Sequence, residues 1–234
     1  MACPTCANKP ADKQIKCAAE HGHLDCLRHL REQGRPWDKR ATQAAALRGH
    51  LHCLRYMREH GCPWDSRAPV CAAQNGHLHC LQYLREQGCP WDEATPAAAA
   101  LNGHLHCLQY LREHGCPWNS QAPANAAYNG HLPCLQYLRE QGCPWNIYAP
   151  VHAVCNEHLH CLRYLIEQGC PWSESTTEAI ASIAEKPTAA DKLDMDTYIN
   201  LLCDLVNCQA PGYQRILDMP LYIEYCLASS PWLK

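Results

Sequence analysis

A tryptophan recurs every 27 residues along most of this chain. Each one follows a proline and closes a near-copy of one repeat, such as GHLHCLQYLREQGCPW at residues 76–91. The series is Trp37, Trp64, Trp91, Trp118, Trp145 and Trp172. A fixed period of about 20–50 residues is typical of solenoids, in which each repeat buries its apolar face only against its neighbours. The period therefore predicts a solenoid of about six repeats.

Each repeat has the pattern of two helices joined by tight turns. An apolar stripe at three- and four-residue spacing, typical of a helix about ten residues long, consists of Leu78, Cys80, Leu81 and Leu84. Gly88 is expected to end this helix in the left-handed conformation. The other helix is short and rich in alanine, and its N-terminal cap is either Asp92 or Thr95, which precedes Pro96. No segment has the pattern of a strand, so the expected fold class is all-α.

The charge and hydropathy of the chain exclude several classes of partner. The net charge of −3 gives no electrostatic reason to expect nucleic acid or an anionic membrane. No run approaches the roughly 18 apolar residues that a membrane span needs. The first residues, MACPTCANKPADKQ, lack the apolar core of a secretory signal. We therefore expect a soluble monomer, cytoplasmic or else nuclear, with neither nucleic acid nor membrane as its partner.

Most of the 19 cysteines follow the same period. One series, always before leucine, is Cys26, Cys53, Cys80, Cys107, Cys134 and Cys161. Another, always between glycine and proline, is Cys62, Cys89, Cys116, Cys143 and Cys170. A cysteine at one site of every repeat is most simply a small buried side chain. Reduced structural cysteine is the favoured interpretation, and disulfides and metal binding are the alternatives.

The histidines and cysteines also suggest a metal site, but their spacing argues against one. His77 and His79 are two positions apart, so on a helix they point about 200° away from each other and cannot share an ion. The only tight metal-spaced pair is Cys3 and Cys6, without a second pair nearby. We expect no metal and no cofactor.

The order of residues within a repeat carries a family resemblance. One repeat contains, in chain order, Thr95-Pro96, a run of alanines, Asn102-Gly103-His104-Leu105, and a Cys-Leu-x-Tyr-Leu helix that ends at Gly115-Cys116. This order resembles an ankyrin repeat over roughly residues 12–186. The repeat departs from the usual length of about 33 residues, because the β-hairpin finger is reduced to a Cys-Pro-Trp-Asp turn. The first helix is also shorter and lacks the family's histidine.

The resemblance implies a partner-binding concave face lined by the short helices and the turns before them. Recognition is expected where the repeats differ, because repeating residues maintain the scaffold. The differing residues proposed to contact a partner are Lys39, Arg40, Arg67, Gln74, Glu93, Leu101, Gln121, Asn125, Tyr128, Ile147, Tyr148 and His152. This face would run from basic at one end to apolar and aromatic at the other.

Two further sets of recurring residues are assigned to the scaffold. The tryptophans are expected to pack between successive repeats as a continuous buried ladder. The Arg-Glu pairs of the longer helices, such as Arg85 and Glu86, are expected to form a solvated outer face, where each ion pair contributes only about 0–1 kcal/mol.

The pattern divides the chain into three parts. Residues 1–10 are a flexible head, residues 11–186 form the ankyrin-like helix–turn–helix solenoid, and residues 187–234 form a helical C-terminal cap or docking segment. End repeats of a solenoid must cover an apolar face that would otherwise be exposed, which favours a cap.

No segment carries a catalytic motif such as a glycine-rich phosphate loop, Gly-x-Ser-x-Gly or His-Glu-x-x-His. The favoured hypothesis is a non-catalytic scaffold or adaptor that binds a protein. One alternative is a metal-binding or redox-responsive protein that uses the cysteines and histidines. Another is a substrate receptor that docks into a larger complex through residues 187–234.

Overall fold

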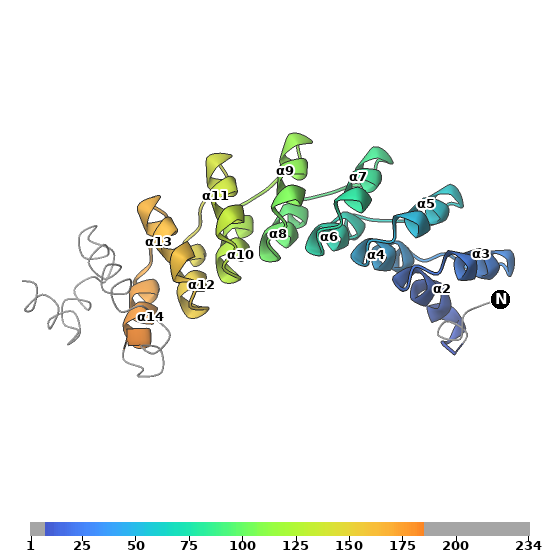
Figure 1. The fold of residues 1–234 in the computed structure, drawn as a ribbon, viewed down its shortest axis with the longest axis horizontal. Coiled ribbons are helices and arrows are strands. Elements are labelled where there is room, and N and C mark those ends of the chain that lie inside the picture. The colour runs from blue at the N-terminus through green and yellow to red at the C-terminus, as the bar shows by residue number, and fades with distance from the viewer. Residues whose placement is uncertain (1–7, 185–234) are drawn as a thin grey trace, which may run out of the picture. The chain divides into compact units, whose positions relative to one another are not determined.

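The computed structural model describes residues 8–184, and within this range the chain forms helices and no strand (Figure 1). The first helices of the repeats are α2 (Ala11–Glu20), α4 (Lys39–Leu47), α6 (Arg67–Gln74), α8 (Ala94–Leu101), α10 (Gln121–Tyr128), α12 (Tyr148–Cys155) and α14 (Glu174–Ala184). The second helices are α3 (Leu24–Glu32), α5 (Leu51–Glu59), α7 (Leu78–Glu86), α9 (Leu105–Glu113), α11 (Leu132–Glu140) and α13 (Leu159–Glu167). The predicted all-α repeat fold is confirmed.

The described residues divide into two compact units. The N-terminal unit comprises residues 8–126 and 133–143, and the C-terminal unit comprises residues 127–132 and 144–184. In the N-terminal unit α2, α4, α6 and α8 pack side by side in one row, and α3, α5, α7 and α9 pack in a second row (Figure 1). In the C-terminal unit α12 packs against α13 and α14.

The core of each repeat is built from the predicted stripe of the second helix and the alanines of the first. Leu81 and Leu84 of α7 are fully buried, as are Ala99 and Ala100 of α8. Alanine at these positions lets the first helices of neighbouring repeats pack closely, because no larger side chain separates them. Each repeat is therefore stabilised mainly by its neighbours, as expected for a solenoid.

An acidic or amide side chain caps the start of the first helix. The backbone N–H of Ala94 donates to Oδ1 of Asp92 at 3.1 Å, and the same bond joins Arg40 to Asp38 at 2.8 Å. Thr95 lies inside α8 with its side chain fully buried. Of the two capping residues considered, Asp92 is therefore correct and Thr95 is wrong.

The second helix ends as predicted. Gly88 has a φ of +74°, and the N–H of Cys89 donates to the carbonyl of Leu84 at 2.9 Å. This bond satisfies a carbonyl that would otherwise lack a partner at the helix end. The chain then leaves through the Cys-Pro-Trp turn without a β-hairpin.

The Gly-His pair joins one repeat to the next. The ring of His104 lies against Gly76 of the preceding repeat so closely that a Cβ on this glycine would be 2.6 Å from Nδ1. The Nε2 of the same ring lies 3.1 Å from the carbonyl oxygen of Gln74. His50 lies against Gly22 in the same way. The histidine therefore links neighbouring repeats, a role that the sequence did not indicate.

The cysteines between glycine and proline form a second link between repeats. The thiol of Cys89 donates to the backbone carbonyl of Asp65 at 3.4 Å, and that of Cys116 donates to Asp92 at 3.5 Å. Both cysteines are buried, as predicted. A thiol fits here because it is small and apolar, and it also supplies a weak donor to a capping residue's carbonyl.

The tryptophans are half-buried, and the arginines are not simply solvated. The guanidinium of Arg85 lies 4.4 Å from the ring centre of Trp91, and Tyr110 of the next repeat meets the same ring edge-on at 6.4 Å. Trp91 therefore contacts the next repeat, as predicted, but its ring is only half-buried there. The guanidinium of Arg85 covers one face of the ring through a cation–π contact, where a fully buried ring would pack against apolar side chains.

Several predictions lie outside the described residues. These are the Cys3–Cys6 pair, most of the proposed head, and the cap or docking role of residues 187–234. Among residues 8–184 no helix is long and apolar enough to cross a membrane.

Candidate functional site

All twelve residues proposed for partner binding lie on the first helix of a repeat or in the turn before it. Nine of them are exposed, and Leu101, Asn125 and His152 are half-buried. These side chains can therefore reach a ligand without disturbing the core.

Two of the basic side chains pair with a capping aspartate. The partner of Lys39 belongs to the next repeat, and that of Arg40 belongs to its own repeat. The ammonium of Lys39 lies 3.1 Å from Oδ2 of Asp65, and Arg40 pairs with Asp38. The backbone N–H of Arg67 donates to Oδ1 of Asp65 at 3.1 Å. Two of the three basic side chains are thus already paired with a carboxylate, which reduces the positive charge that they offer to a ligand.

The polar members in the middle of the series do not form one cluster. Gln121 donates to the side-chain oxygen of Asn125 at 2.7 Å, and Asn125 donates to the carbonyl of Ala97 at 3.0 Å. Among the described residues, neither Gln74 nor Glu93 has an ion pair with another member of the set. The middle of the series is therefore polar, and its side chains do not gather into one binding site.

The aromatic members come together in the C-terminal unit. His152 of α12 meets the ring of Tyr128 edge-on at 5.4 Å, and it stacks on Tyr148 at 6.3 Å. Tyr128, Ile147 and Tyr148 are 45%, 44% and 58% exposed, and they are the exposed large hydrophobic side chains among the described residues. We call Tyr128, Ile147, Tyr148 and His152 the aromatic cluster.

The described cysteines and histidines do not form a metal site. No group of three or more histidine, cysteine or acidic side chains in residues 8–184 could hold a metal ion. Burial raises the pKa of Cys80 to about 11 and that of Cys89 to about 12. Because the thiolate is the form that binds metal and reacts, burial lowers the reactivity that we expect of these thiols at neutral pH. The metal-binding alternative is not supported.

This difference in burial predicts which cysteines react. Cys155 of α12 is exposed, whereas Cys89 is 1% exposed. We expect iodoacetamide at neutral pH to label Cys155 at least about tenfold faster than Cys89, because only the former thiol is accessible. Mass spectrometry of peptides from a timed reaction measures both rates. The two rates should become similar in denaturant, and equal rates in native buffer would contradict the burial of the repeat cysteines.

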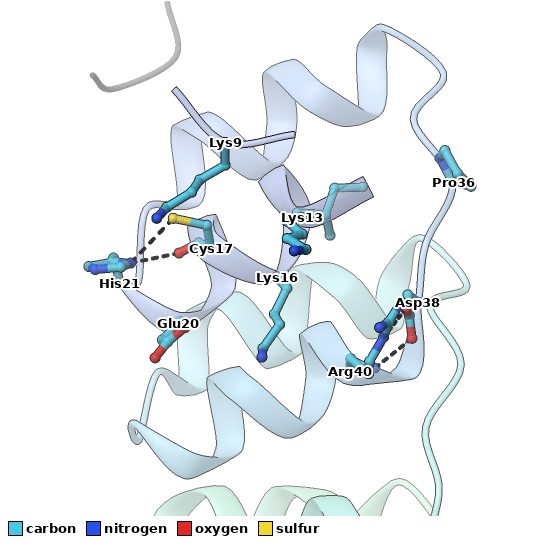
Figure 2. Close-up of a pocket in the computed structure, with 10 residues that line it drawn as sticks. Lys9, Lys13, Lys16, Cys17, Glu20, His21, Pro36, Asp38 and Arg40 are labelled. Carbon is cyan, nitrogen blue, oxygen red and sulfur yellow. Dashed lines mark hydrogen bonds and ion pairs between the residues drawn. The ribbon is translucent and has the colours of Figure 1, made fainter. Parts of the chain in front are cut away.

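One charged group was missed because it precedes the first full repeat. Lys9, Lys13 and Lys16 line a pocket beside the start of α4 (Figure 2). Their spacing of four and three residues is a signal that could have identified one basic helix face. The predicted boundary between the head and the solenoid separates Lys9 from Lys13 and Lys16, which lie on α2.

Comparisons with known proteins agree with the fold. A family model described as ankyrin repeats (3 copies) matches residues 15–90 and 43–122. Among solved structures, the crystal structure of the human ASB11 ankyrin repeat domain matches with a TM-score of 0.57 and 19% sequence identity. The match covers 70% of this chain and 85% of that one. A search of curated proteins gave no match.

Proposed function

Because this chain belongs to the ankyrin repeat family, we propose that it is a non-catalytic adaptor that binds a protein partner through its aromatic cluster. Ankyrin repeats are generally protein–protein interaction modules, and their fold is typically a binding scaffold without enzymatic activity. We further propose that the chain is a monomer of the cytoplasm or nucleus, and that its first helices line a concave face.

The observation that carries the proposal is the grouping of Tyr128, Ile147 and Tyr148. Aromatic residues are enriched at the energetically important centres of protein interfaces, where their rings bury a large area at low entropic cost. These three large side chains are about half exposed and have no role in the core of their own repeats, and the two tyrosines contact the same histidine. Burial against a partner would remove this apolar surface from water.

The charge of the C-terminal unit indicates which partner would fit. Its described residues contain one basic side chain, Arg163, and four acidic ones, which are Glu157, Glu167, Glu174 and Glu178. A partner with an apolar segment flanked by basic residues would therefore complement both the cluster and its surroundings. Electrostatic attraction of this kind raises the association rate and suppresses acidic competitors.

Replacement of the two tyrosines tests the proposal. The Tyr128→Gln/Tyr148→Gln variant introduces the residues that stand at the equivalent positions Gln74 and Gln121, so the repeat should tolerate both changes. Truncation of two aromatic interface residues is expected to weaken binding by at least about tenfold per residue that acts as a hot spot. Partners captured from cell extract with the wild-type chain are identified first, and their dissociation constants are then measured for both proteins.

The control is Gln109→Ala, which changes an exposed residue on the second helix α9. This variant should bind with wild-type affinity. Circular dichroism should show the same helix content and unfolding midpoint for all three proteins. Unchanged affinity of the tyrosine variant, with its fold intact, would remove the aromatic cluster as the binding site.

A further inference from the structure

A cavity with many charged side chains lies in the N-terminal unit, between α2 and the start of α4. It has a volume of about 270 Å³ and is lined by lysines, by Arg40 and Asp38, and by the apolar side chains of Ile15 and Pro36. Figure 2 shows Lys13 and Lys16 projecting from α2, with Arg40 and Asp38 at the start of α4. We call Lys9, Lys13, Lys16 and Arg40 the basic group.

The two carboxylates of the pocket are already bound, and the three lysines are not. Glu20 pairs with Arg48 at 3.3 Å, and Asp38 pairs with Arg40. Among the side chains that the structure describes, no carboxylate forms an ion pair with Lys9, Lys13 or Lys16. The pocket therefore has unneutralised positive charge, in contrast to the starts of α4 and α6.

The equivalent site in the following repeat shows what this pocket lacks. Gln43, the counterpart of Lys16, donates to Oδ1 of Asp65 at 2.9 Å, and Lys39 binds the other oxygen of that carboxylate. Asp38, the counterpart of Asp65, instead accepts the backbone N–H and the guanidinium of Arg40. Lys16 thus lacks the carboxylate that its counterpart has in the next repeat.

Asp38 forms its contacts with Arg40 and does not pair with the lysines of the pocket. The hydrogen bond from the backbone N–H of Arg40, together with the guanidinium of the same residue, holds the pKa of Asp38 below its ordinary value. Asp38 is therefore ionised at neutral pH, yet its charge is shared with Arg40. A carboxylate supplied by a ligand would occupy beside Lys16 the place that Asp65 has beside Gln43.

We propose that this pocket binds an acidic segment of a protein partner, with glutamate or aspartate carboxylates seated between Lys13, Lys16 and Lys9. The apolar walls from Ile15 and Pro36 suit the methylene groups of a glutamate side chain. This site goes beyond the proposed function, because it is separate from the aromatic cluster and selects the opposite charge. It would give the chain a second point of recognition.

A peptide fits these observations better than a nucleic acid. The pocket is one local site that includes two carboxylates, and the whole chain has a net charge of −3. Nucleic-acid binding depends on basic side chains that follow the phosphate backbone over several residues, often with aromatic rings for the bases. Among the described residues that line this pocket, His21 contributes the one aromatic ring, and there is no tyrosine or tryptophan on which a base could stack.

The test uses fluorescent hexaglutamate as the probe and the full-length chain. We expect the probe to bind, whereas hexaglutamine should not, and raising the salt from about 0.05 M to about 0.5 M should weaken binding because it screens exposed charges. The Lys13→Gln/Lys16→Gln variant should raise the dissociation constant by about two- to thirtyfold, the range for two exposed charge contacts. Fluorescence anisotropy measures each constant.

The matched control is Arg139→Gln/Arg163→Gln, which removes the same two charges from α11 and α13, outside the pocket lining. This control should keep wild-type affinity for hexaglutamate. An equal loss in both variants, or none in the lysine variant, would overturn the proposal. So would lysine-dependent binding of a labelled thymidine decanucleotide without binding of hexaglutamate. Neither outcome depends on the partner of the aromatic cluster, so the two proposals fail separately.

Discussion

Replacement of Gly76 by alanine is expected to lower the free energy of unfolding by about 2–5 kcal/mol. Two costs add. Gly76 has a φ of +70°, a conformation that costs a residue with a Cβ about 1–2 kcal/mol. The new Cβ would also lie 2.6 Å from Nδ1 of His104, and relief of such overpacking costs about 1–3 kcal/mol. The ring cannot swing away cheaply, because its Nε2 is bonded to the carbonyl of Gln74.

Gly88→Ala is the matched control. Gly88 has nearly the same φ, +74°, but no atom lies within 4 Å of the position that its Cβ would occupy. It should cost only the backbone term of about 1–2 kcal/mol. Chemical denaturation of the wild type and the two variants gives their free energies of unfolding, which are compared with one common value for the dependence on denaturant concentration. Introduction of Gly76→Ala into a His104→Ala background should then cost no more than Gly88→Ala, and equal costs for both glycines in the wild-type background would contradict the inter-repeat contact.

The sixth repeat supports this explanation. Glu157 occupies the place of the glycine and has a φ of +60°. The histidine that faces Gly22, Gly49, Gly76 or Gly130 stands 28 residues later, but residue 185 is a glutamate. A side chain at position 157 therefore faces no histidine from that position. The next repeat requires a glycine at this position, because the ring of its histidine packs there. At position 157 that histidine is missing, so a side chain incurs only the backbone cost of the left-handed conformation.

The features that could be predicted from the sequence are those that depend on neighbouring residues. The apolar stripe around Leu81 and the left-handed Gly88 follow from spacing within one helix, and the structure confirms both. The contact of His104 with Gly76 joins residues 28 apart. Spacing within one helix carries no information about which carbonyl a ring in the next repeat will reach. The same holds for the thiol of Cys89 and the carbonyl of Asp65.

The candidate sites differ in the same way. Tyr128 and Tyr148 stand where the other repeats have different residues, so comparison of the repeats was enough to select them. Their contacts with His152 required the structure. The pocket at Lys13 and Lys16 could not be found by comparison of repeats, because the basic group depends on which carboxylates are already bound by Arg40 and Arg48.

Because the tryptophans are half-buried, we expect the truncation of a tryptophan to cost less free energy of unfolding than the truncation of a core leucine. A tryptophan fully buried between repeats would make Trp91→Ala the more costly change, at about 3–5 kcal/mol. In the structure Leu81 is 0% exposed, whereas Trp91 lies at the surface with Arg85 over its ring. Truncation of Leu81 leaves a cavity that the packed helices cannot fill, but water can enter the space vacated by Trp91.

We therefore expect Leu81→Ala to lower the free energy of unfolding by about 2–5 kcal/mol, and Trp91→Ala by about 1–3 kcal/mol. The Arg85→Ala variant isolates the cation–π contact and should cost no more than about 1 kcal/mol. Denaturant unfolding of the three variants measures these differences. If Trp91→Ala costs more than Leu81→Ala, the rings form a buried ladder after all. In that case the tryptophans would contribute more to the stability of the contacts between repeats than the packed leucines and alanines do.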